Sequence, residues 1–208
     1  MASNKYRVVS NWRVTGRLDE VAAILGDPES WQRWWPAAFL RVTEGSPQCA
    51  GGVGRWVSVH SKGWLPYTLR LRARVARCRY PFGCRLAVEG DFVGRCDCSL
   101  EQRGHDVVLV FDWQVQVHKP VVRRLSWLLK PAFVANHKWV MRQGQRSLDI
   151  EVRRRGSLRR GMRPPDESPP QPTFPYGARY AWLRNAAARI AQLFQRLAPI
   201  GRRSPQLP

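Results

Sequence analysis

Apolar and polar residues alternate along residues 106–117, DVVLVFDWQVQV. One set of positions is entirely apolar, whereas the other includes Asp112 and Gln114. A period of two over this length predicts a β-strand with one buried face and one largely solvated face. The period then changes, because apolar residues between positions 131 and 148 recur at helical spacing. They predict a long amphipathic helix with Pro131 in its first turn, where the missing N–H costs nothing.

Shorter elements precede this strand and helix. Residues 5–16 predict a first strand, and residues 18–25 predict a short helix with two acidic side chains in its first turn. A second short helix carries Trp31, Trp34 and Trp35 before a proline. We favour a role for these tryptophans in plugging the open edge of a curved sheet. Direct stacking on a ligand is the alternative.

Five further strands are predicted between the short helices and the strand at 106–117. They are short apolar-alternating runs separated by turn signals, which indicates an antiparallel meander. The runs are 39–43, 55–61, 67–78, 84–89 and 94–101, with a glycine-rich loop at 45–54 and a hairpin turn at 80–83. The order along the chain is therefore one strand, two short helices, six strands and one long helix.

The strand at 67–78 places three arginines, Arg70, Arg72 and Arg74, on its polar face. Acidic residues occur on the polar faces of the strands that follow. They are Glu89, Asp91, Asp97 and Glu101. Cross-strand pairs of opposite charge stabilise a solvated sheet face, so we predict that these acids match the arginines. We favour such a solvated ladder over a nucleic-acid-binding stripe.

This order of elements predicts an α+β fold in which a curved antiparallel β-sheet wraps around one long C-terminal helix. We assign residues 1–154 to this domain. A strongly curved sheet cannot seal against a single helix, so we expect a cavity between them.

Three segments of this domain resemble the START/Bet v 1-like (SRPBCC) superfamily, specifically its bacterial polyketide cyclase/dehydrase and lipid-transport group. They are DPESWQRWWP (27–36), FDWQV (111–115) and KPVVRRLSWLLKPAFVANHKWVMRQGQRSL (119–148). The resemblance implies the helix-grip fold, with a deep pocket between sheet and long helix for apolar or amphipathic molecules. It implies no single chemistry, because relatives include carriers, cyclases and hydrolases, and a shared fold does not establish a shared function.

The side chains expected to face this pocket are mostly apolar. Strand alternation and helical spacing turn inward Tyr67, Leu69, Leu71, Leu86, Val88, Cys96, Cys98, Leu109, Phe111, Trp113, Val115, Phe133, His137, Val140 and Met141. A lining of this kind binds by desolvation, with a few polar groups that fix orientation. The predicted ligand contacts are Tyr67, Leu69, Leu71, Phe111, Trp113, Phe133, Asn136, His137 and Met141.

The polar candidates for chemistry inside the pocket are His60, Tyr67, Asn136 and His137. A cyclase needs a general acid or base within hydrogen-bond reach of the reacting atoms, and the ordinary pKa of histidine lies near neutrality. His137 is the main catalytic candidate, with His60 or Tyr67 as a second proton-transfer group. However, Asp97 and Asp112 have outward parity, so no carboxylate orients His137. We therefore favour a packed core histidine over ligand contact, and ligand contact over catalysis.

Charge and cysteine content limit the partners, the location and the metal sites that the sequence can be expected to have. The formal net charge of +20 favours anionic partners, although an arginine-rich composition alone also explains it. We expect no signal peptide, and no apolar run approaches the ~20 residues of a membrane span. Five cysteines without a tight framework fit reduced thiols in a cytoplasmic protein. Cys96 and Cys98 suit small apolar fillers better than a metal site, so we predict no metal and no cofactor.

The chain changes character after residue 154. Residues 155–177 are rich in Pro, Ser and Arg and predict an extended linker, and residues 199–208 a disordered tail. Residues 178–198 predict a basic amphipathic helix that resembles an interfacial membrane anchor. Its contact residues would be Trp182, Arg184, Arg189, Phe194 and Arg196. We favour docking on the protein's own body or dimerisation, ahead of an anionic membrane surface and then nucleic acid.

The sequence therefore predicts a non-catalytic carrier or binding protein for a hydrophobic small molecule or lipid. The alternative is an aromatase/cyclase-type enzyme that acts on a polyketide-like substrate by His-assisted proton transfer. A nucleic-acid-binding function rests on charge alone, predicts affinity that falls steeply with salt, and is disfavoured. We expect a cytoplasmic location, either free or peripheral at the inner membrane surface.

Overall fold

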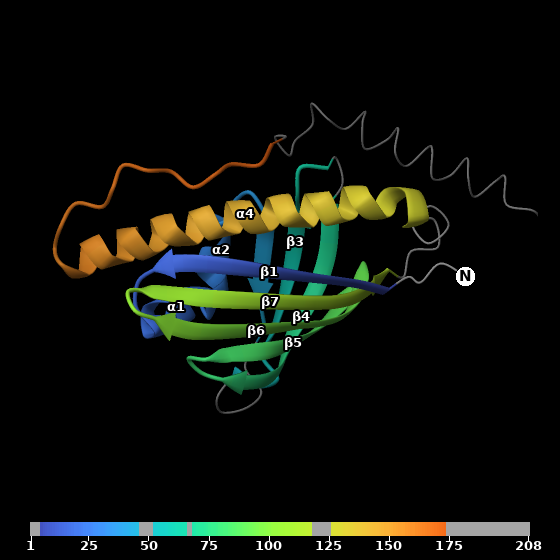
Figure 1. Ribbon diagram of the computed structural model, residues 1–208, viewed down its shortest axis with the longest axis horizontal. Helices are drawn as coiled ribbons and strands as arrows, with labels where there is room; N and C mark the ends of the chain where they lie inside the picture. The colour runs from blue at the N-terminus through green and yellow to red at the C-terminus, as the bar shows by residue number, and fades with distance from the viewer. Residues whose placement is uncertain (1–4, 46–51, 66–67, 118–125, 174–208) are drawn as a thin grey trace, which may run out of the picture. The chain divides into compact units, whose positions relative to one another are not determined.

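The computed structural model describes residues 5–45, 52–65, 68–117 and 126–173 (Figure 1). Seven strands form one antiparallel sheet in the order β1-β7-β6-β5-β4-β3-β2. The strands are β1 (Lys5–Thr15), β2 (Phe39–Glu44), β3 (Trp56–Lys62), β4 (Thr68–Arg79), β5 (Gly83–Gly90), β6 (Phe92–Arg103) and β7 (Asp106–Val117). The sheet curves beneath one long helix, which confirms the predicted α+β fold.

Three short helical segments join β1 to β2. They are α1 (Leu18–Leu25), η1 (Pro28–Ser30) and α2 (Trp31–Trp34). Trp34 is only 2% exposed and stacks on Trp35 at a ring-centroid distance of 5.6 Å. Trp35 in turn meets Trp12 of β1 edge to face at 5.3 Å. This packing agrees with the predicted role of the tryptophans as a plug against the sheet.

The long helix, α4 (Ser126–Arg159), packs on β1, α1 and α2 (Figure 1). It begins earlier than predicted, so Pro131 lies inside the helix and not in its first turn. It also continues past residue 154, where the sequence suggested that a linker begins. The additional turn is held by ion pairs, because Arg155 contacts Asp27 at 2.8 Å and Arg159 contacts Glu20 at 2.7 Å.

The strand register defines an inner face of the sheet, which is the face toward α4. Trp12 of β1 lies opposite Leu109 of β7, which lies opposite Leu100 of β6. These three side chains join a buried cluster with residues of α1, α2 and α4. The remaining members of the cluster are Val14, Val21, Ala22, Ile24, Trp34, Val107, Met141, Leu148 and Val152. The hydrophobic core therefore sits under the middle and C-terminal part of α4.

A buried ion-pair network fastens α4 to η1 and α2. The Glu151 side chain is 2% exposed and accepts hydrogen bonds from Arg33, Arg154 and Arg155 at 2.7–2.9 Å. Burial alone would raise the pKa of Glu151, but the three guanidinium groups outweigh burial and hold that pKa well below its ordinary range. Arg155 also donates to Asp27, just before η1. This network joins segments that are more than a hundred residues apart in the sequence.

The outer face of the sheet carries ion pairs, and those of Asp97 and Glu101 differ from the predicted ones, whereas Glu89 lies opposite Arg72 as expected. Asp97 pairs with Arg85 and Arg95, and Glu101 pairs with Arg103. The prediction that Asp97 and Glu101 match the three arginines of β4 is therefore wrong. Cross-strand pairing depends on register, and the register places Arg85, not an arginine of β4, opposite Asp97.

Several predictions fall on residues outside the described ranges. They concern Tyr67, the helix predicted at 178–198 with Trp182, Arg184, Arg189, Phe194 and Arg196, and the tail at 199–208. Within the described ranges, no helix has the length and apolar character needed to span a membrane.

Candidate functional site

The inner face of the sheet divides into two zones. The packed zone contains side chains that are 0–3% exposed, among them Trp12, Val14, Leu109 and Leu148. The partly exposed zone is defined by Leu69, Leu71, Leu86, Trp113, Phe133 and His137, all of intermediate exposure. Its sheet residues share the inner face through the register, since Leu69 opposes Ser61, Leu71 opposes Val59, and Trp113 opposes Cys96, which opposes Leu86. Apolar side chains that face inward are therefore incompletely covered in this zone.

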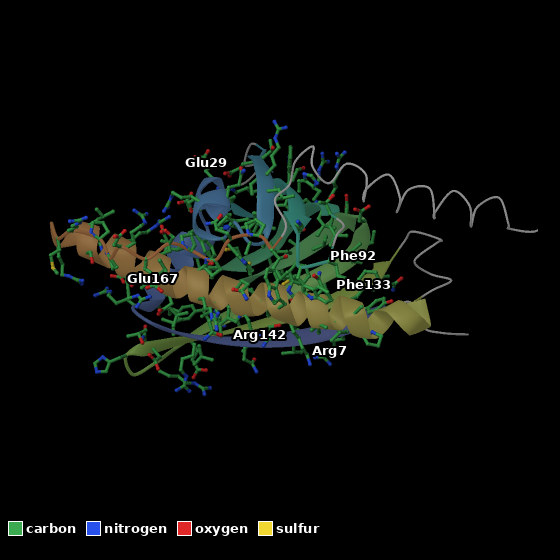
Figure 2. All side chains as sticks on the ribbon, turned by 90° about the horizontal axis from the view of Figure 1, so that it is seen from above. Arg7, Glu29, Phe92, Phe133, Arg142 and Glu167 are labelled. Atoms are coloured by element: carbon green, nitrogen blue, oxygen red, sulfur yellow. The ribbon has the colours of Figure 1, made fainter. Side chains whose placement is uncertain are left out.

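The N-terminal part of α4 faces the partly exposed zone. The imidazole of His137 meets the Trp113 ring edge to face, with centroids 6.1 Å apart. Phe133 lies one helical turn before His137, and Figure 2 shows it toward one end of α4, with Glu167 near the other end. Helical spacing thus brings Phe133 and His137 to the same side of α4.

Two polar atoms of this zone are buried without a hydrogen bond. The Nε1 atom of Trp113 and the Nε2 atom of His137 have no partner among the described residues. Buried polar groups normally find a partner, in the protein or in a bound molecule. Burial also lowers the pKa of His137 to about 4, so its side chain is neutral at pH 7. The zone therefore offers an indole N–H donor and a neutral imidazole nitrogen next to apolar surface.

Asn136, another predicted ligand contact, forms a structural hydrogen bond between α4 and the segment that follows β3. Its Oδ1 accepts a hydrogen bond from the backbone N–H of Leu65 at 3.1 Å, and the residue is 7% exposed. A Cβ atom on Gly63 would collide with the Asn136 amide, so the glycine makes this approach possible. Asn136 thereby ties α4 to the connection between β3 and β4.

The structure separates the other predicted contacts. Leu69, Leu71, Trp113, Phe133 and His137 fall together in the partly exposed zone. Met141 is 5% exposed inside the buried cluster, and Phe111 packs on Trp12 at 4.7 Å. Both of these side chains are therefore occupied by packing within the protein.

His60 does not lie with His137, which corrects the expectation that it faces the interior. The register places His60 opposite Arg41 and Arg70, whereas its neighbour Val59 faces inward and is buried. The side chain therefore points to the outer face. Alternation within the strand already puts His60 on the face opposite to Val57 and Val59, so the expectation of an inward His60 did not follow from the pattern.

The cysteines of the inner face are protonated thiols. Burial raises the pKa of Cys84 to about 11 and raises that of Cys96 further. The register lines up Cys78, Cys84 and Cys98 on neighbouring strands. Among the described residues, no group of three side chains is arranged to hold a metal ion.

Two further features escaped the sequence analysis. Lys62, at the end of β3, is 7% exposed, and burial lowers its pKa. An open hollow of about 460 Å³ lies over the outer face of β2, β3 and β4 and contains His60. Only the alternation of Arg70 and Arg72 hinted at the hollow, because strand register decides which side chains of the adjoining strands lie beside them.

Comparison with known proteins supports the fold. Neither a protein-family model nor a curated protein matches the sequence. Among solved structures, TTHA0849 from Thermus thermophilus is 12% identical, covers 71% of this chain and 97% of its own, and has a TM-score of 0.56. A START superfamily protein from Mycobacterium smegmatis is 15% identical, covers 70% of this chain and 96% of its own, with a TM-score of 0.56.

The structural similarity to these two proteins shows a common fold. At identities of 12% and 15% it leaves the ligand and the activity of the chain open. The long helix over a curled seven-stranded antiparallel sheet is the architecture that these matches share with the chain. The chain therefore has the helix-grip fold that its sequence predicted, and its fold is similar to that of the START superfamily protein from Mycobacterium smegmatis.

Proposed function

We propose that the chain binds a hydrophobic small molecule or lipid between the sheet and α4, as a carrier or binding protein without catalysis. The observation that carries this proposal is the partly exposed zone of the inner face. Its apolar side chains point toward α4 yet keep solvent-accessible surface. Covering apolar surface contributes about 25 cal/mol per Å², so a ligand that fills this zone gains affinity by desolvation.

The polar atoms of the zone narrow the chemistry of the ligand. The Trp113 N–H is a donor, and the neutral His137 Nε2 either donates or accepts, depending on its tautomer. A ligand with a hydroxyl or carbonyl oxygen on an apolar skeleton would satisfy both. We therefore propose an amphipathic ligand over a pure hydrocarbon.

The environment of His137 argues against catalysis. A general base works best when its pKa lies near the operating pH, and a pKa of about 4 makes His137 a weak base at pH 7. Among the described residues, no carboxylate hydrogen-bonds to His137 to raise that value. Polyketide cyclisation with His137 as the proton-transfer group stays as the second candidate, since the imidazole lies in the zone where a ligand would bind.

The first experiment is native mass spectrometry of the protein purified from its own host, followed by organic extraction of any bound molecule. A co-purifying lipid or polyketide-like compound would support the binding function and give a substrate to test for turnover. Turnover of that compound, lost in His137→Gln, would favour the cyclase.

A binding assay with a matched pair of variants tests the location. The probe is N-phenyl-1-naphthylamine, an uncharged fluorescent apolar molecule. Leu69→Phe fills the partly exposed zone and should weaken probe binding by about tenfold, which corresponds to ~1.4 kcal/mol. Val9→Phe adds the same ring on the outer face, where Val9 is 49% exposed, and should leave binding unchanged. Equal binding by both variants would contradict the proposed location.

A membrane contact through residues 178–198 is a separate proposal, supported by their basic amphipathic sequence. Truncation after residue 173 removes this segment and keeps all of α4, whereas truncation at residue 155 would cut the helix. Co-sedimentation with anionic vesicles should be lost on truncation after residue 173. Retained sedimentation would exclude the segment as the anchor.

A further inference from the structure

The outer face of the sheet carries a second candidate site, on the side opposite to α4. We call it the outer hollow: an open depression of about 460 Å³ over β2, β3 and β4. Its outward-facing side chains are Arg41, Thr43, Ser58, His60, Arg70, Arg72 and Glu89. The side chains that define the partly exposed zone point to the opposite face of the sheet.

The register arranges these side chains in two neighbouring rows. His60 lies between Arg41 and Arg70 in one row, and Ser58 lies between Thr43 and Arg72 in the next. Side chains directly opposite on antiparallel strands have Cβ atoms about 5 Å apart. Three guanidinium groups, one imidazole and two hydroxyl groups therefore converge from three strands.

The outer hollow contains three arginines and one carboxylate, that of Glu89, so positive charge is in excess. Among the described residues, Arg41, Arg70 and Arg72 form no ion pair, although Glu89 faces Arg72 in the register. By contrast, the carboxylates elsewhere on the outer face are engaged by other arginines. Asp112 pairs with Arg7 at 2.8 Å, and Asp97 with Arg85 and Arg95.

The surroundings of Arg72 and His60 restrict one side chain and affect the pKa of the other. The guanidinium of Arg72 stacks over the Trp56 ring at 4.5 Å, which restricts its side chain without using its charge. Burial, and after it the charge of the neighbouring Arg70, lower the pKa of His60.

We propose that the outer hollow binds a phosphate group, carried either by a free phosphate compound or by a lipid headgroup. Arginine forks match phosphate oxygens bidentately, and the Ser58 and Thr43 hydroxyls are additional donors. A dianion suits a site with three unpaired arginines and one carboxylate better than a monoanion does. The proposal is independent of ligand binding on the inner face.

The test follows the His60 imidazole by NMR in the full chain while inorganic phosphate is added at constant ionic strength. The His60 signal should shift saturably, and its pKa should rise, because a bound dianion offsets the field of Arg70. His105, which is exposed outside the hollow, is the internal reference. Arg70→Gln should weaken phosphate binding about tenfold or more, because it removes a charged hydrogen-bond donor from the site.

Arg142→Gln is the matched control, because it removes one exposed arginine charge from α4, away from the hollow (Figure 2). It should leave phosphate affinity unchanged. Both variants should bind N-phenyl-1-naphthylamine like the wild type, which separates this site from the inner face.

Vesicles distinguish the two sources of phosphate. If the group belongs to a lipid headgroup, phosphatidylcholine vesicles that contain phosphatidate should co-sediment more of the protein than vesicles of equal charge that contain phosphatidylglycerol. Arg70→Gln or added inorganic phosphate should remove this difference, whatever sedimentation residues 178–198 supply to both kinds of vesicle. If the phosphate compound is free in solution, phosphatidate should add no Arg70-dependent sedimentation while the NMR titration still saturates.

Three results would overturn the proposal. The first is a His60 signal that phosphate does not move. The second is an equal response in the wild type and in Arg70→Gln. The third is a response to a single-stranded oligonucleotide but not to inorganic phosphate, which would identify a polyanion-binding surface instead.

Discussion

The two parts of α4 lie over the same sheet but differ in how completely the side chains beneath them are buried. From Met141 to Val152 the helix is sealed against Trp12 and Leu109, and Glu151 locks it to α2. Around His137 it faces apolar side chains that keep solvent-accessible surface. We infer that the packed part of α4 supplies most of its contribution to folding stability, and we propose the part around His137 for ligand binding. The packed part contributes burial to folding, which leaves the other part able to expose apolar surface to a ligand.

Glu151→Gln tests the ion-pair network around Glu151 and should have a large effect on stability. Removing the carboxylate charge leaves three guanidinium groups facing one another around a buried position, so we expect a loss of about 3 kcal/mol in the free energy of unfolding. Urea denaturation measures this loss. Glu167→Gln is the control, because its pair with Arg153 is about half exposed on both sides and should contribute below ~1 kcal/mol. Similar losses in both variants would refute this role of the network.

Leu148→Ala and Leu69→Ala compare the two zones directly. Leu148 is fully buried, so its truncation should cost about 2–5 kcal/mol and leave affinity for N-phenyl-1-naphthylamine unchanged in the folded protein. Leu69 is partly exposed, so its truncation should cost only ~1 kcal/mol but alter probe affinity. If probe affinity responded to Leu148→Ala and not to Leu69→Ala, the division into zones would be wrong.

Gly144→Ala probes how closely α4 approaches the tryptophans. A Cβ atom there would collide with Trp35 and lie 2.6 Å from the Trp12 ring, so we expect destabilisation of about 1–3 kcal/mol despite the better helix propensity of alanine. Gly156→Ala lies on the same helix, with no atom closer than 3.6 Å to the added carbon. It should stabilise the protein by up to ~1 kcal/mol. Thermal unfolding distinguishes the two signs.

The pH dependence of stability tests the environment of His137 and should be the smallest effect. Its pKa is about 4 in the folded protein, below the ordinary value of 6.5, so the unfolded chain binds the proton more readily. The contribution of His137 to the free energy of unfolding is fully present well above pH 6.5. It is lost as the pH falls from 6.5 toward 4. Between pH 7 and 5.5 we expect a loss of about 1 kcal/mol that His137→Gln removes. An equal slope in the variant would show that His137 is solvated.

Much of the fold follows from local patterns that a single sequence displays. Alternation predicted all seven strands, including β7, and helical spacing predicted α4, because period two and period 3.6 are properties of the backbone itself. The ends of α4 were placed less well. Its final turn is held by Arg155 and Arg159 through partners near the N-terminus, which no local pattern reveals.

The candidate sites could be predicted only in part, for the same reason. Leu69, Leu71 and Trp113 were expected inward and lie on the inner face, since strand parity follows from alternation. Strand parity does not say which inward residues are fully buried. The residues that bury Met141 come from α2 and β1. His60 was named as a polar candidate for the pocket without a parity argument, and its pairing with Arg41 and Arg70 puts it on the outer face.

By itself, the sequence determined the order of elements, the α+β class and the apolar character of one sheet face, because these depend on neighbours within a few residues. Only the tertiary structure decided which apolar residues remain partly exposed, which arginines find a carboxylate, and that Arg41, His60 and Arg70 share one hollow. Those outcomes depend on strand register and helix placement, through which residues far apart in the sequence come within a few ångströms.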